Sequence, residues 1–260
     1  MSAQPRSSRP GCLGWLWRAL LLAILLPVAL LAAAFGIWWL QLPALENLTR
    51  PDTGLVVERE SPAGRISRVL VGTKNRNWMP LRAISPYLVI AVVASEDDAF
   101  FQHAGFDLDQ IRKSLEANLK SEKYRRGAST LTMQLARNLY LVREKTLWRK
   151  LREVYLAWRL ERLLTKRRIL ELYLNVAEWG PGVFGAPAAA RYHFGTSAGR
   201  LTLAQAALLA AILPSPIRFD PHRAPRTARS KQLYLLERLV REHKVSEAAY
   251  QNALAELDPL

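Results

Sequence analysis

The sequence predicts a mainly α-helical protein with one N-terminal transmembrane helix. Residues 19–40 contain no charged side chain, and helix-capping signals recur after residue 80. Half of the 260 residues are apolar, which is enough to bury a sizeable core. Only two short segments, Leu55–Glu58 and Ile66–Val71, have the pattern of β-strands.

The uncharged segment Ala19–Leu40 has 22 residues and would span about 33 Å as a helix, enough to cross a bilayer. Arg6, Arg9 and Arg18 precede it, and no acidic residue does. The positive-inside rule therefore predicts a cytoplasmic tail over residues 1–18 and a signal-anchor helix over residues 19–40. A cleaved signal peptide is the alternative, but its apolar region is usually only about 7–15 residues long.

The charge balance predicts an anionic partner. The chain has 37 Lys and Arg against 22 Asp and Glu, a net charge of +15. A domain tethered outside the membrane meets anionic headgroups and lipid diphosphates more readily than nucleic acid, so we expect no nucleic-acid partner. Cys12 is the only cysteine, which excludes an intramolecular disulfide. The histidines, His103, His193, His222 and His243, lack the spacing of zinc ligands, and no structural zinc site is predicted.

The outer part divides into a linker with short strands, residues 41–77, and a helical domain, residues 78–260. Ser85 and Pro86 predict the start of a helix over Tyr87–Ala94, which places Glu96 at its C-terminal end. The negative end of that helix, together with Asp97 and Asp98, disfavours an ionised Glu96. The residues therefore indicate a base of raised proton affinity, although three consecutive acids are also typical of a solvated turn.

Two basic segments follow. Leu108–Lys123 is a basic amphipathic segment, either packed on the core or dipped into a membrane surface. Arg125 and Arg126 then precede Gly127 and Ser129, and Ser129 is predicted to cap a helix over Thr130–Leu141 whose N-terminus can bind an anion.

A long helix is predicted over Thr146–Leu164, with its inner side formed by Leu147, Leu151, Val154, Tyr155 and Trp158. Arg149 and Lys150 lie four and three residues before Glu153 on this helix. They form either ordinary intrahelical ion pairs or a charged cluster that holds a diphosphate.

The last elements supply a loop and a core helix. A helix from Lys166 to Asn175 is followed by a glycine-rich loop, Gly180–Gly185, which can line a cleft. Thr202 and Gln205 form a capping box that opens an apolar helix ending before Pro214.

Taken in order, five motifs resemble those of the monofunctional biosynthetic peptidoglycan transglycosylases, glycosyltransferase family 51. They are Glu96-Asp97 with Phe100, His103 and Gly105; Gly127–Thr132 with Gln134; Arg149-Lys150 with Glu153; Lys166 and Ile169 with Tyr173 and Asn175; and the Leu203–Pro214 helix. The resemblance covers roughly residues 78–221. It implies a lysozyme-like helical domain that joins lipid II units into glycan strands at a membrane surface.

The resemblance also implies roles for individual residues. Glu96 is the base that takes the proton of the acceptor's 4-hydroxyl, and Glu153 assists the leaving diphosphate, directly or through a divalent cation such as Mg²⁺ or Mn²⁺. The residues implied to neutralise the phosphate charge are Ser129, Arg137, Lys145, Arg149 and Lys150. The other implied substrate-binding residues are Asp97, Phe100, His103, Gly127, Thr132, Gln134 and Asn175.

Departures from the family pattern are few. Ala128 replaces a glycine, and Met133 replaces a glutamine whose amide hydrogen bonds a thioether cannot make. No serine is followed by lysine three positions later, so separate transpeptidases are expected to crosslink the product. The alternatives from other functional classes are an anchored lytic transglycosylase or muramidase, which needs no diphosphate site, and a scaffold that binds cell-wall polymers, which needs no Glu96. The expected location is the bacterial inner membrane, with the catalytic domain on the periplasmic side.

Overall fold

The computed structural model describes residues 12–40, 42–60, 66–107, 109, 112, 114, 116, 129–141 and 146–257. The chain forms two compact units, Met1–Ala44 and Leu45–Leu260. Of the predicted functional residues, Gly127 and Lys145 lie outside the described residues, as does most of the amphipathic segment 108–123.

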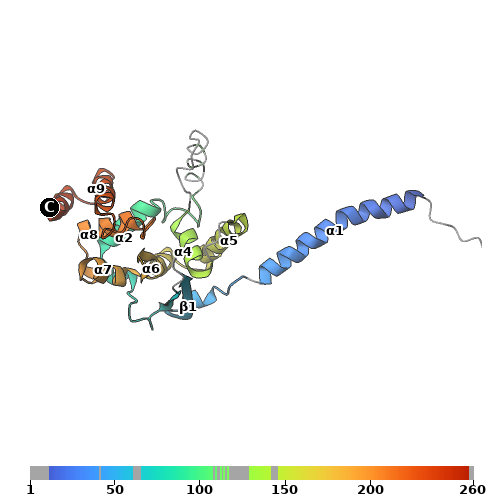
Figure 1. Ribbon diagram of the computed structural model, residues 1–260, viewed down its shortest axis with the longest axis horizontal. Helices are drawn as coiled ribbons and strands as arrows, with labels where there is room; N and C mark the ends of the chain where they lie inside the picture. The colour runs from blue at the N-terminus through green and yellow to red at the C-terminus, as the bar shows by residue number, and fades with distance from the viewer. Residues whose placement is uncertain are drawn as a thin grey trace, which may run out of the picture. The chain divides into compact units, whose positions relative to one another are not determined.

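The first unit contains the helix α1, Cys12–Leu40 (Figure 1). A helix over the predicted segment is therefore confirmed, and Pro27 lies inside it. Its large apolar side chains between Trp15 and Leu30 are exposed. Among the described residues, no helix has the length and hydrophobicity that crossing a membrane requires.

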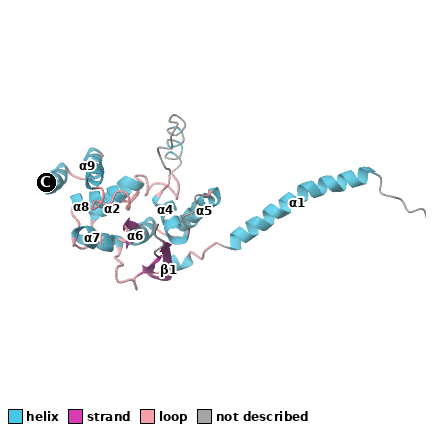
Figure 2. Cartoon of the chain, in the orientation of Figure 1, coloured by secondary structure: helices cyan, strands magenta, loops and turns pink. Residues whose placement is uncertain are grey.

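The second unit is mainly helical, as predicted, with two small antiparallel hairpins (Figure 2). Its α-helices in the described part of the chain are α2 (Pro86–Glu96), α4 (Leu131–Tyr140), α5 (Leu147–Leu163), α6 (Lys166–Val176), α7 (Ala186–Phe194), α8 (Leu203–Ile212), α9 (Pro225–Arg241) and α10 (Glu247–Leu257). The strands are β1 (Asp52–Glu60), β2 (Ile66–Gly72), β3 (Glu178–Gly180) and β4 (Val183–Phe184), and short 3-10 turns cover Glu46–Thr49, Leu81–Ala83 and Ala198–Arg200. Helix α8 packs against α2, α9 and α10, while α4 packs against α5 and α6.

Helix α8 is the centre of the core. Eight of its ten residues are buried, and five of those eight are alanines, whose small side chains let neighbouring helices approach closely. The capping box of Thr202 and Gln205 is present, and the helix ends before Pro214. The sequence predicted this helix because its capping box and the proline after it lie within a few residues of the helix ends.

The inner face of α5 differs from the prediction. Leu151 and Trp158 are 55% and 40% exposed, whereas Glu153 is completely buried together with Leu156 and Leu160. The prediction was therefore wrong for Leu151 and Trp158, whereas Val154 and Tyr155 are half-buried, because the helix is rotated so that Glu153 lies inside. The apolar periodicity of the sequence cannot predict which face of α5 is buried, because one buried position holds a charged residue that is neutralised by its own ion pairs.

The start of α4 also differs from the prediction by one residue. Thr130, not Ser129, is the N-cap: its hydroxyl accepts the hydrogen bond of the Met133 N–H at 3.3 Å and donates to the Gly105 carbonyl at 2.6 Å. Ser129 is therefore released from capping, and its hydroxyl bonds elsewhere.

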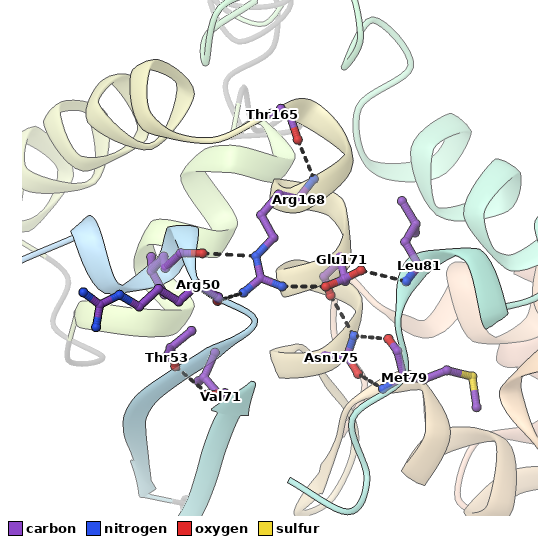
Figure 3. A network of polar contacts seen from close by, with 10 residues as sticks. Arg50, Thr53, Val71, Met79, Leu81, Thr165, Arg168, Glu171 and Asn175 are labelled. Atoms are coloured by element: carbon purple, nitrogen blue, oxygen red, sulfur yellow. Dashed lines mark hydrogen bonds and ion pairs between the residues drawn. The ribbon is translucent and has the colours of Figure 1, made fainter. Parts of the chain in front are cut away.

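The two predicted strands form the antiparallel hairpin β1–β2, with Val57 opposite Val69. A two-stranded hairpin is at best marginally stable by itself, and here α6 supports the segment before it (Figure 3). Arg168 of α6 donates from Nε to the Leu48 carbonyl at 3.1 Å, from a terminal nitrogen to the Arg50 carbonyl at 2.5 Å, and from the other to Glu171. Glu171 in turn accepts the Leu81 N–H at 2.9 Å.

Replacing Arg168 with lysine should therefore lower the free energy of unfolding by about 1–3 kcal/mol. A single ammonium group cannot reach the three acceptors that the planar guanidinium serves. Chemical denaturation measures the effect, with Arg167→Lys as the control because Arg167 is an exposed neighbour on the same helix. Equal stability of the two variants would contradict a role for Arg168 in holding this segment.

Candidate active site

Glu96 is the last residue of α2, as predicted, and it faces an open cavity of about 420 Å³. Ser85 and Pro86 start this helix, but the Ser85 hydroxyl donates to the Leu201 carbonyl at 2.8 Å instead of capping. The cavity is lined by Ala94, Ser95, Glu96, Asp97, Asp98, Ser129, Gln134, Arg137, Leu213, Pro214 and Arg238. Helix α2, the start of α4, the end of α8 and helix α9 thus meet around one carboxylate.

A chain of hydrogen bonds fixes the orientation of the Glu96 carboxylate. Gln134 donates from Nε2 to Glu96 Oε2 at 2.7 Å, and the buried Tyr173 hydroxyl donates to Gln134 Oε1 at 3.0 Å. Oε1 of Glu96 is buried and has no hydrogen-bond partner among the described residues. One carboxylate oxygen is therefore held in place, while the other accepts no hydrogen bond from the described residues.

Burial raises the pKa of the Glu96 carboxyl above its ordinary value. The hydrogen bond from Gln134 and the charge of Arg137 oppose this rise, and the charge of Asp97 adds to it. The predicted direction is confirmed, but its main cause is desolvation and not the neighbouring acids. Asp98 instead pairs with Lys244 at 3.0 Å and Arg238 at 3.8 Å.

Asp97 and His103 join the end of α2 to the start of α4. Asp97 is buried, and its oxygens contact His103 Nε2 at 2.9 Å and accept the Leu131 N–H at 2.9 Å. The Gly105 N–H donates to His103 Nδ1 at 3.2 Å, so Nε2 is the ring nitrogen that carries the proton and donates to Asp97. Burial raises the pKa of Asp97, while His103 and the Leu131 N–H counteract it.

Asp97→Asn should destabilise the fold by about 1–3 kcal/mol. An amide has one acceptor oxygen, so one of the two donors, His103 or Leu131, would face an NH₂ group. Asp98→Asn is the control, since its surface ion pairs are worth only about 0–1 kcal/mol. The comparison is made by denaturant titration, and an Asp97 variant as stable as the Asp98 variant would exclude the bridging role.

The second predicted glutamate lies in a cluster of cations. Glu153 accepts from Arg149 at 2.6 Å on one oxygen and from Lys150 at 2.9 Å on the other. The Lys150 ammonium also donates to the Ser129 hydroxyl at 2.9 Å. Because Ser129 lines the Glu96 cavity, the two glutamate motifs meet through Ser129 and Lys150.

These contacts do not favour a metal ion held at Glu153 by protein ligands alone. Both oxygens of Glu153 already accept hydrogen bonds from cations, which would repel a divalent ion. Within the described part of the chain, Glu153 belongs to no group of three His, Cys, Asp or Glu side chains that could share an ion.

Four predicted or noted positions make contacts within the protein, and the role of the first three in binding substrate stays a prediction. Phe100 is fully buried, with the Lys166 ammonium 4.5 Å from its ring centre. The buried Thr132 hydroxyl donates to Glu161. The side-chain amide of Asn175 donates to the Met79 and Glu171 carbonyls and accepts the Met79 N–H (Figure 3). Met133 is buried in α4, which explains how a thioether fits there.

Two residues that were not predicted contribute to the site. Tyr173 orients Gln134, and Arg238 of α9 lines the Glu96 cavity. Tyr173 belongs to the fourth motif, so the sequence could have indicated its place in the site. Arg238 is about 140 residues from Glu96 and belongs to no motif, so the sequence gave no sign of its role. A second cavity, of about 210 Å³, shares Gln134, Arg137, Leu213 and Pro214 with the first.

Comparison with known proteins places this site in a family. Residues 63–240 match the family described as Transglycosylase. A biosynthetic peptidoglycan transglycosylase of Methylobacillus flagellatus is 42% identical, over 81% of this chain and 89% of that protein. A protein with the same name from Nitrosomonas eutropha is 40% identical, over 92% of this chain and 96% of that protein. Another from Chromobacterium violaceum is 53% identical, over 60% of this chain and 69% of that protein. The chain belongs to the transglycosylase family and is a peptidoglycan glycosyltransferase.

Proposed function

We propose that the chain polymerises lipid II by transferring the growing lipid-linked glycan to the 4-hydroxyl of an acceptor sugar. The observation that carries this proposal is the link between the two glutamates. Ser129 lines the cavity of Glu96 and accepts a hydrogen bond from Lys150, which also binds Glu153. A base and an anion-binding cluster therefore serve one cavity, as a transfer from a diphosphate requires.

In the proposed reaction, the Glu96 carboxylate takes the proton of the acceptor hydroxyl. The hydroxyl oxygen bonds to the anomeric carbon of the donor as the bond from that carbon to the diphosphate oxygen breaks, which inverts the configuration. The raised pKa of Glu96 favours this role, since a carboxylate of higher proton affinity is a stronger base.

The cations stabilise the charge that develops on the leaving diphosphate. Lys150 is 41% exposed in its side chain and can turn from Ser129 towards a phosphate oxygen, while Glu153 keeps it and Arg149 in place. Arg137 lines both cavities and can contact the substrate from α4. A divalent cation, Mg²⁺ or Mn²⁺, would have to be held largely by phosphate oxygens, because the protein ligands at Glu153 are already engaged.

We also propose that residues 19–40 anchor the protein in the bacterial inner membrane, with the catalytic domain on the periplasmic side. The 22 uncharged residues and the three arginines before them support this orientation. The net charge of +15 favours an anionic membrane surface, where separate transpeptidases would use the product. The lysozyme-like arrangement stays a prediction, supported by the mainly helical fold of the second unit.

Incubating the full-length protein with lipid II, and separately with finished peptidoglycan, tests the reaction. Formation of glycan polymer from lipid II supports the proposal. Cleavage of finished peptidoglycan without polymer formation would identify a lytic enzyme instead, and no reaction with either would leave a binding scaffold. Neither alternative explains why Ser129, Lys150 and Arg149 gather beside the cavity of Glu96.

A further inference from the structure

A second group of chemistry-bearing side chains lies outside both cavities. His193 is in the last turn of α7, while Asp220 and His222 lie in the connection between α8 and α9. A ring nitrogen of each histidine and a carboxylate oxygen of Asp220 all lie within 4.8 Å of one another. The spacing of these residues in the sequence gave no sign of this cluster, because His193 is 27 residues before Asp220.

The hydrogen bonds of His193 leave one of its nitrogens with a free lone pair. Nε2 lies 2.9 Å from the Trp179 carbonyl oxygen, and a carbonyl only accepts, so Nε2 carries the proton. Nδ1 is buried and has no hydrogen-bond partner among the described residues. A histidine that binds a metal commonly donates its other ring N–H to a backbone carbonyl in the same way.

Asp220 is a buried carboxylate with little compensation. It is 1% exposed, and it accepts a hydrogen bond from the His222 N–H at 3.0 Å. In the described part of the chain it takes part in no salt bridge with lysine or arginine. A buried carboxylate is costly unless it is paired or coordinates a metal.

We propose that His193, Asp220 and His222 bind a zinc ion, with a water molecule in the fourth position. Two imidazoles and one carboxylate are typical zinc ligands. Ligands about 2.0–2.2 Å from zinc stand about 3.5 Å apart in a tetrahedron, so the three side chains must close slightly. His222 can make this movement because it is exposed, whereas His193 and Asp220 are held by their own contacts.

The ion would join the end of α7 to the connection between α8 and α9. None of its three ligands lines either cavity around Gln134, so the ion takes no part in sugar transfer. The same connection begins with Leu213 and Pro214, which line both cavities. Zinc would therefore brace the wall of the active site from outside.

Calorimetric titration of zinc chloride into untagged, chelator-treated full-length protein tests the site. One equivalent should bind to the wild type and raise its thermal unfolding midpoint. Asp220→Asn and His222→Ala should each weaken binding by at least about tenfold. His243→Asn is the matched control: His243 is exposed and lies outside the cluster, and asparagine tolerates its positive φ of 54°.

The outcomes separate the site from adventitious binding. Unchanged zinc affinity in His222→Ala, or an equal loss in His243→Asn, would overturn the proposal, as would a wild type that binds no zinc. If Asp220→Asn fails to fold, His222→Ala decides, since His222 is on the surface. Substitution with cobalt should in addition give the absorption spectrum of a tetrahedral site in the wild type and not in His222→Ala.

Discussion

Glu96→Gln should lower the rate of glycan polymerisation by about 100-fold or more while lipid II still binds. The amide oxygen of glutamine can accept the hydrogen bond from Gln134, so the side chain keeps its place. It cannot take a proton from the acceptor hydroxyl. Initial polymerisation rates and lipid II binding, measured on the same preparations, distinguish the loss of chemistry from the loss of affinity.

The raised pKa of Glu96 gives this prediction a pH signature. The wild-type rate should fall as the pH drops through a value above the ordinary pKa of a glutamate, about 4.3, because the base becomes protonated there. Since the folded state binds this proton more tightly than the unfolded state, ionised Glu96 destabilises the fold above its folded pKa. Glu96→Gln should therefore unfold at a higher temperature than the wild type near neutral pH, and this advantage should vanish below the ordinary pKa.

Asp98→Asn is the matched control for both measurements, because Asp98 is an exposed carboxylate that lines the same cavity. It should keep most of the rate and show no gain in stability. Near-normal turnover in Glu96→Gln would remove the proposed base, and an equal loss in both variants would show that the cavity needs negative charge and not a particular base.

Glu153→Gln should lower the rate by about 10- to 1000-fold, because the cations that stabilise the leaving diphosphate lose their orientation. Glutamine can accept from one of Arg149 and Lys150, but its NH₂ group faces the other. Binding of lipid II should change less than the rate, since charge on the diphosphate grows towards the transition state. The measurement is the initial rate at a series of magnesium concentrations. A steeper response to magnesium in the variant than in the wild type supports a cation that enters with the diphosphate.

Glu161→Gln is the control on the same helix. Glu161 also pairs with a lysine, Lys166 at 2.7 Å, and lines neither cavity around Gln134. Both variants should lose stability, but only Glu153→Gln should lose rate per folded molecule. A similar loss of rate in both would attribute the effect to packing of α5, and an unchanged rate in Glu153→Gln would exclude the diphosphate role.

Local signals in the sequence predicted much of the helical framework. The capping box at Thr202, the proline at the start of α2 and the placement of Glu96 at its end are all confirmed. Each depends on residues within one or two turns, where backbone geometry restricts the choices. The five ordered motifs also identified the family, because a chance match of all of them is far less probable than a match of one.

Tertiary structure decided which side chains face inward and which meet. The buried side of α5 carries Glu153 because Arg149 and Lys150 neutralise it there, and Thr130 replaces Ser129 as the cap because it also binds Gly105. Tertiary structure also brings Gln134 to Glu96, which is 38 residues away, and brings His193 together with Asp220 and His222.

The physical reason is the range of the interactions. Caps, turns and periodicity act between residues a few positions apart, so the order of residues along the chain determines them. Other features require that helices far apart in the sequence pack together at a particular rotation. They are the unpartnered oxygen of Glu96, the hydrogen bond between Ser129 and Lys150, and the unpartnered nitrogen of His193. That rotation is set by the burial of whole faces, and only the folded chain determines it.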